Sequence, residues 1–199
     1  MSDDLVLGEA KEFEPWPVFP EDAIFEAVVR EAKIYTTKMT DKDTNEPVKR
    51  VKFKFEALAP ETWPAEDGTP IPIKVADNEG VMRNRKFFGE TSVAFTQHEN
   101  CKLYNWVLAI IGAKEGLPKG FTLHREADGT LRPLIGKQCR IVLEINEWDD
   151  KKNPKEDDVT GQITYPKRRN NRVKAVAKTR SAPLAGATQS SPDYDEEPF

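Results

Sequence analysis

Apolar and polar residues alternate along two segments of the chain, and no other sequence feature constrains the fold as strongly. The segments are 48–58, VKRVKFKFEAL, and 134–148, LIGKQCRIVLEINEW. Successive side chains of a β-strand point to opposite faces, so a period of two predicts strands with one buried face. In the first segment that face would consist of Val51, Phe53, Phe55 and Ala57. In the second it would consist of Cys139, Ile141, Leu143 and Ile145.

Three further segments complete a predicted set of five strands. Residues 23–37 mix β-branched and aromatic residues in partial alternation, although EAVVREAK within them also has the propensity of a helix. Residues 81–90 are the third strand in sequence, and residues 161–178 are the fifth, with a break at Pro166. A polar turn is expected at 39–47. Residues 59–80 hold four prolines and two glycines, which predicts an irregular inserted loop.

One helix is expected between the third and fourth strands. Thr96 and Glu99 fit a capping box at its start, and Gly112 is a stop signal at its end. Its apolar stripe at helical spacing consists of Leu103, Trp106, Val107, Ile110 and Ile111.

This order of elements predicts a mainly β protein: a five-stranded, partly open OB-fold barrel with one helix between strands three and four. Four regions follow along the chain. An acidic N-terminal arm covers 1–20, and an OB-fold domain covers 21–180. A flexible linker covers 181–192, and a disordered acidic C-terminal tail covers 193–199.

The net charge of −4, from 30 bases and 34 acids, hides strongly charged blocks. Residues 1–31 carry nine acids and two bases, whereas residues 159–192 carry seven bases and no acid. The last seven residues carry four acids and no base, so residues 1–192 are formally neutral. Such asymmetry is a better guide to partners than the total charge.

Several classes of protein are disfavoured by the sequence. The longest apolar run, 106–113, is too short to span a membrane, and the acidic start MSDDLVLGEA does not resemble a signal peptide. The cysteines lie far apart, which favours a reducing, cytoplasmic location. We find no catalytic motif and expect neither an enzyme nor a cofactor. His98, Cys101, His124 and Cys139 could supply zinc ligands, but their spacing favours buried thiols without metal.

Bases interleaved with aromatics are the most informative candidate site, because single-strand binders pair phosphates with cations and stack bases on aromatic rings. The second strand offers Arg50, Lys52 and Lys54, and the third offers Arg83, Arg85 and Lys86 beside Phe87 and Phe88. Adjacent phenylalanines on a strand face opposite ways, so we expect one ring to face outward and stack on a base. Phe88 is included among the candidate site residues, but the pattern leaves open which of the two rings faces outward. Coverage of both rings by the Pro-rich loop is the alternative.

Two other groups extend this candidate nucleic-acid site. Tyr35 and Lys38 lie near the first barrel loop, and Trp148 lies near the fourth-to-fifth loop, where it could pack or stack. The basic segment contains Tyr165, Lys167, Arg168, Arg169 and Arg172. Four bases within six residues, unrelieved by acids in sequence, suggest a nearby anion, although a solvated basic patch is the alternative.

The C-terminus combines a small-residue linker with an acidic motif that ends in an aromatic residue. The motif consists of Asp193, Tyr194, Asp195, Glu196, Glu197, Pro198 and Phe199. It resembles the tail of single-stranded DNA-binding proteins of bacteria and their phages. The strand pattern, with LIGKQCRIVLEI and NNRVKAV, resembles the phage-type OB-fold branch of that class over residues 20–178.

The resemblance implies sequence-independent binding of single-stranded DNA in replication, recombination or repair. It also implies that the tail recruits replication or recombination proteins and lies near the DNA site when DNA is absent. The long acidic arm and the Pro-rich insertion depart from the bacterial type, so a homo-oligomer is left open. DNA against RNA is also left open. The rival functions are an OB-fold protein–protein adaptor with a nucleic-acid-mimicking tail, and a subunit of a nuclease or recombination enzyme.

Overall fold

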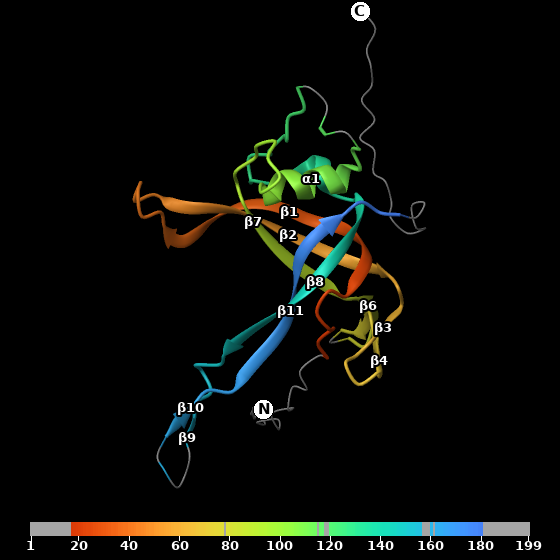
Figure 1. The fold of residues 1–199 in the computed structure, drawn as a ribbon, viewed down its shortest axis with the longest axis vertical. Coiled ribbons are helices and arrows are strands. Elements are labelled where there is room, and N and C mark those ends of the chain that lie inside the picture. The colour runs from red at the N-terminus through yellow and green to blue at the C-terminus, as the bar shows by residue number, and fades with distance from the viewer. Residues whose placement is uncertain are drawn as a thin grey trace, which may run out of the picture.

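Five long strands close into a barrel in the computed structural model, which describes residues 17–77, 79–114, 116–117, 120–156, 160 and 162–180 (Figure 1). Around the barrel the strands follow the order β1-β2-β7-β11-β8, and β8 pairs back with β1. All neighbours are antiparallel except β7 and β11, which are parallel. Their bounds are β1 Ile24–Thr40, β2 Pro47–Ala59, β7 Lys86–Ser92, β8 Gln138–Asp149 and β11 Lys167–Ala177.

The alternation predicted from the sequence is confirmed in β2 and in most of β8. Val51, Phe53, Phe55 and Ala57 are fully buried inside the barrel, while the residues between them are half-buried. Cys139, Ile141 and Leu143 are fully buried in the same way, and Ile145 is half-buried. Residues 24–37 of the first predicted strand, for which a helix was the alternative, lie in the strand β1. The predicted fifth strand, residues 161–178, is broken at Pro166, between β10 (Ile163–Thr164) and β11.

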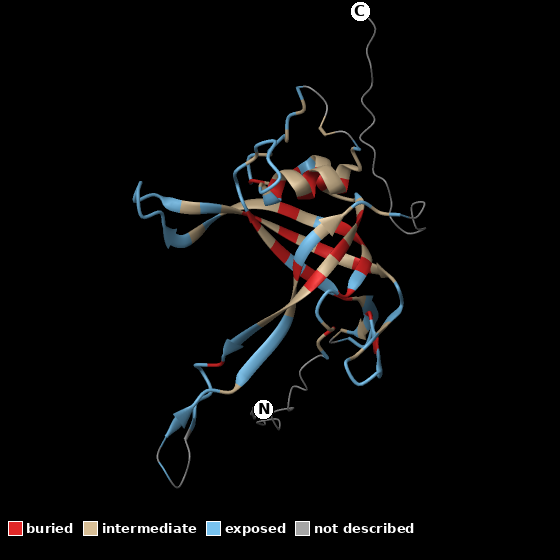
Figure 2. Cartoon of the chain, in the orientation of Figure 1, coloured by how far each residue is buried: buried red, intermediate tan, exposed pale blue. Residues whose placement is uncertain are grey.

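The helix α1, Lys102–Ile111, lies between β7 and β8 in the chain and against the barrel (Figure 2). Its buried residues are part of the core cluster of the barrel. Its end at Gly112 is confirmed: this residue has φ 77° and donates its N–H to Leu108 O at 3.0 Å. The capping box was wrong. The N-cap is Cys101 and no side chain caps it, and both Thr96 and Glu99 lie before the helix.

The Pro-rich insertion is more regular than the sequence predicts. It forms two small antiparallel sheets, one of β3 (Thr62–Pro64) with β4 (Pro70–Pro72), the other of β5 (Lys74–Ala76) with β6 (Met82–Asn84). Prolines are tolerated in such short, edge-like strands because no ladder continues beyond them. Ile71 and Ile73 are buried, so the insertion covers part of the core.

The folded unit begins before residue 21. Phe19 is fully buried, with its ring centroid 4.9 Å from that of Phe25. The side chain of Asn171 accepts the Phe19 N–H and donates to the Phe19 carbonyl, both at 2.8 Å. The end of the N-terminal arm is therefore part of the core and is held by β11.

The remaining elements are short. The 3₁₀ helix η1 covers Arg132–Leu134, and β9 (Lys155–Glu156) pairs with β10 at the tip of the β8–β11 hairpin. The first sixteen residues, the linker and the acidic tail lie outside the described residues. Within the described part of the chain, no helix has the length and apolar character needed to cross a membrane.

Candidate nucleic-acid interface

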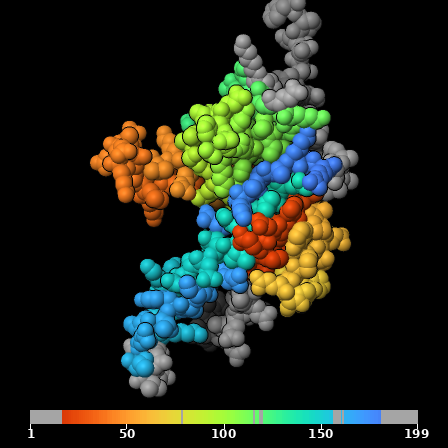
Figure 3. Space-filling model, in the orientation of Figure 1, coloured from red at the N-terminus to blue at the C-terminus, as the bar shows by residue number. Residues whose placement is uncertain are grey.

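Two hairpins extend beyond the barrel as arms. The β1–β2 arm ends in the turn at 41–46, and the β8–β11 arm ends in the small β9–β10 sheet. In the space-filling view both arms project from the body with open space between them (Figure 3). Because β7 lies between β2 and β11 in the barrel, it runs between the strands that form the two arms.

Phe88 stands at the centre of the outward side of β7. Its Cα partners are Lys54 on β2 and Arg172 on β11, so a cation lies on either side of the ring. The Nζ of Lys52 lies 5.1 Å from the ring centroid. Phe88 is 42% exposed, whereas Phe87 points into the core. We call the outward residues Tyr35, Arg50, Lys52, Lys54, Lys86, Phe88, Glu90 and Arg172 the central face.

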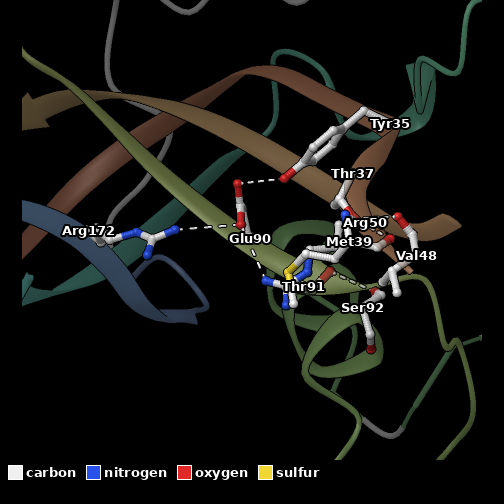
Figure 4. A network of polar contacts seen from close by, with 9 residues as sticks. All are labelled: Tyr35, Thr37, Met39, Val48, Arg50, Glu90, Thr91, Ser92 and Arg172. Carbon is white, nitrogen blue, oxygen red and sulfur yellow. Dashed lines mark hydrogen bonds and ion pairs between the residues drawn. The ribbon is translucent and has the colours of Figure 1, made fainter. Parts of the chain in front are cut away.

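Glu90 connects four strands at this face (Figure 4). The hydroxyl of Tyr35 donates to its Oε1 at 2.8 Å, and its Oε2 lies 3.5 Å from guanidinium nitrogens of both Arg50 and Arg172. Burial, together with the hydrogen bond to Glu90, raises the pKa of Tyr35 above its usual value. The hydroxyl of Tyr35 therefore stays protonated to a higher pH than that of an exposed tyrosine.

An open hollow of about 370 Å³ lies beside this network. Its lining consists of Glu31, Lys33, Tyr35, Lys52 and Glu90. The Lys33 ammonium pairs with Asp128 at 3.0 Å, whereas no carboxylate of the described residues lies within ion-pair distance of Lys52 or Lys54. The hollow thus combines an aromatic ring with a cation that has no internal counter-ion among the described residues.

The sequence suggested that no acids lie near the basic segment, but the structure places acids of β8 and Asp150 beside it. The antiparallel register of β11 with β8 places Lys167 and Arg169 opposite Asp149 and Glu147. Lys167 pairs with both acids at 3.2 and 3.4 Å, Arg169 pairs with Glu147 at 3.7 Å, and Arg168 pairs with Asp150. The hydrogen bond to Asp149 raises the pKa of Lys167.

Two aromatic side chains are exposed along the same arm. Tyr165, just before β11, is 44% exposed, and Trp148 on β8 is 40% exposed. Trp148 is the Cα partner of Arg168 and shares the outward side of β8 with Glu144, the partner of Arg172. The arm therefore extends the outward surface that begins at the central face.

Arg85 is not available to a ligand, contrary to the sequence prediction. It is 6% exposed, its guanidinium lies 4.6 Å above the Phe19 ring, and it donates to the Pro17 carbonyl at 2.8 Å. Burial lowers its pKa to about 10. The sequence could not indicate this, because the segment that covers Arg85 lies 68 residues earlier in the chain.

The remaining predicted residues are placed as follows. Arg83 lies on β6, outside the barrel, and pairs with Asp77. Lys38 is exposed on the β1–β2 arm, and Lys86 is exposed at the start of β7. The structure thus brings Lys86 but not Arg83 onto the central face, and it leaves Lys38 near the tip of an arm.

Two residues of this region were missed from the sequence. Glu90 was overlooked because acids were not considered as part of a basic surface, and Lys33 was not assigned to the site. The available signal was the period of two, which places Phe88 and Glu90 on one side of a strand. Within the described ranges, no three His, Cys, Asp or Glu side chains gather to hold a metal ion, and Cys139 is buried in the barrel.

In comparisons with known proteins, no family model, curated protein or solved structure matches this chain.

Proposed function

We propose that this chain is an OB-fold protein that binds single-stranded DNA without sequence preference. The observation that supports this most directly is the exposed Phe88 ring with Lys54 and Arg172 on either side and the Lys52 ammonium beside it. A ring in this setting offers a stacking surface to any base, and the cations can follow the phosphates.

The topology supports the proposal. In OB-folds, oligonucleotides bind the face of strands two and three and the loops that join strands one to two and four to five. The corresponding parts here are β2 with β7, the β1–β2 arm and the β8–β11 arm. The central face and both arms therefore coincide with the surfaces that this fold uses for nucleic acid.

Binding would use two kinds of contact. Phe88, Tyr35 and Trp148 present aromatic surface, and stacking on such rings is tolerant of sequence because every base has a π face. Lys52 and Lys54 neutralise phosphates directly. Arg172 and the bases of the segment 167–169 contact phosphates by exchanging their internal carboxylate partners for DNA.

The acidic tail, 193–199, supports a second role, the recruitment of replication or recombination proteins. A terminal Phe can insert into an apolar pocket of a partner while a basic rim pairs with the acids. The protein would then coat single-stranded DNA and bring partner proteins to it.

The decisive experiment is a fluorescence titration with oligo-dT, with a duplex of equal length as the competitor, at two salt concentrations. We expect tighter binding to oligo-dT and a loss of affinity as salt rises. Equal or tighter binding to duplex would refute the proposal. An absence of oligo-dT binding would favour the protein–protein adaptor, and tighter binding to oligo-U would move the proposal to RNA.

A pair of variants locates the site. The double variant Lys52→Ala and Lys54→Ala should weaken oligo-dT binding and reduce the salt slope by about 1.4 log units, because each phosphate contact on a single strand contributes about 0.7. Lys74→Ala is the matched control, since Lys74 is exposed on β5 and makes no ion pair with the described residues. A loss of the same size in the control would place the site elsewhere.

A further inference from the structure

Glu90 occupies an unusual position for an acid, at the centre of a face that is proposed to bind phosphate. Its carboxylate is half-buried and accepts from the Tyr35 hydroxyl at 2.8 Å. Its Oε2 lies 3.5 Å from both Arg50 and Arg172, which come from strands on opposite sides of β7. One oxygen thus pairs with two guanidinium groups that are separate in the sequence.

The surroundings of Glu90 are those of an anion site. Lys102 of α1 lies close enough to interact electrostatically with Glu90, Glu144 and Arg172. Burial lowers the pKa of Lys102, and the charge of Arg172 acts in the same direction, while the two acids oppose it. Two guanidinium groups from two strands thus flank one carboxylate. Lys102, from a third element, interacts with it electrostatically, as it does with the second acid, Glu144.

A phosphate would make the contacts that Glu90 now makes. Guanidinium groups bind carboxylate and phosphate oxygens with similar geometry, and charge-assisted hydrogen bonds of both kinds are the strong ones. The position also lies two residues along β7 from Phe88, on the same side of the strand. A nucleotide stacked on Phe88 would carry its phosphates within reach of this cluster.

We infer that Glu90 is an internal anion that fills a phosphate subsite, and that a DNA phosphate displaces it from Arg50 and Arg172. The inference rests on the proposed binding of single-stranded DNA. Displacement also removes the acceptor of the Tyr35 hydroxyl, so the ring at the edge of the 370 Å³ hollow becomes free to move towards a base. Glu90 therefore lowers the affinity and the salt dependence of the wild-type protein.

The variant Glu90→Gln tests the inference, because the amide keeps the size and an oxygen acceptor for Tyr35 but loses the charge. We expect oligo-dT to bind about 2- to 30-fold more tightly, because two partly exposed ion pairs no longer compete with the phosphates. The salt slope should rise by about 1.4 log units as two guanidinium groups become available to phosphates. Glu90→Asp, which keeps the charge, should bind more weakly than Glu90→Gln.

Glu79→Gln is the matched control. Glu79 is exposed before β6, and its side chain makes no hydrogen bond or ion pair with the described residues, so the variant changes the net charge alone. An equal gain of affinity in Glu79→Gln would show a general charge effect and overturn the inference. Unchanged or weaker binding by folded Glu90→Gln would overturn it as well, since Glu90 would then be only a structural anchor.

A second probe separates the inference from the proposed function. If the wild-type protein fails to bind oligo-dT, the proposed function is wrong, and the same variants are titrated with inorganic polyphosphate, which has no bases. Tighter polyphosphate binding by Glu90→Gln than by Glu79→Gln would still establish the phosphate subsite. Equal binding by the two variants would refute it.

Discussion

Replacement of Phe88 by Ala separates stacking from charge at the central face. The ring is 42% exposed and makes a cation–π contact with Lys52 at 5.1 Å. Such a contact contributes about 0.5–1 kcal/mol at an exposed site, so the loss of folding stability should be small. Stacking of one base on an aromatic side chain contributes about 1–3 kcal/mol, which corresponds to a loss of about 5- to 150-fold in affinity for oligo-dT.

The salt dependence gives the sharper signature for Phe88→Ala. No charge is removed, so the slope of affinity against salt should equal that of the wild type, whereas the lysine variants should lower it. Tryptophan fluorescence titration at three salt concentrations measures both quantities. Met82→Ala is the control, because Met82 is 60% exposed on β6, outside the barrel. A Phe88→Ala affinity within twofold of the wild type would refute stacking on this ring.

Three further predictions concern the core, the pH dependence and the tail. Gly89→Ala should destabilise the protein by about 1–3 kcal/mol, measured by urea unfolding, because a Cβ there would lie 2.5 Å from Trp106 Cη2. The backbone N–H of Thr130, with the Lys33 ammonium, lowers the pKa of Asp128 to about 2. Its contribution to stability is therefore complete above about pH 4 and is lost as the pH falls through 2, which acid titration of thermal unfolding in wild type and Asp128→Asn would detect. Deletion of 193–199 should raise oligo-dT affinity at low salt and abolish partner capture, and unchanged affinity would exclude competition by the tail.

The period of two made the strands predictable, because a local pattern decides which side chains face the core. It placed Val51, Phe53 and Phe55 inside the barrel, and their burial agrees. It also required one of Phe87 and Phe88 to face outward, and the structure shows that this ring is Phe88. The start of α1 could not be predicted in the same way, because Thr96 and Glu99 have the composition of a cap but lie before the N-cap residue, Cys101.

Contacts between distant segments could not be predicted, because they depend on the register of pairing. Register brings Glu90 between Arg50 and Arg172, and it sets Glu147 opposite Arg169. The burial of Arg85 depends on the path of the N-terminal segment, which covers this side chain. The sequence therefore indicated which residue types form the candidate site but not which of its charges are already paired.

These internal pairs determine how steeply binding should depend on salt. The sequence nominates eleven bases, of which Arg85 is buried and six have a carboxylate within ion-pair distance. The four without such a partner among the described residues are Lys38, Lys52, Lys54 and Lys86.

A base that exchanges an internal carboxylate for a phosphate changes no net pairing, so it should contribute little to counterion release. At about 0.7 per phosphate, four free lysines predict a slope near 3, whereas all ten accessible bases would give about 7. Titration with oligo-dT between 50 and 300 mM salt distinguishes these values, because the Debye length falls from about 14 Å to about 6 Å over this range. A slope near 7 would show that the ion pairs of β11 open without cost, and the central face would then be a simple basic patch.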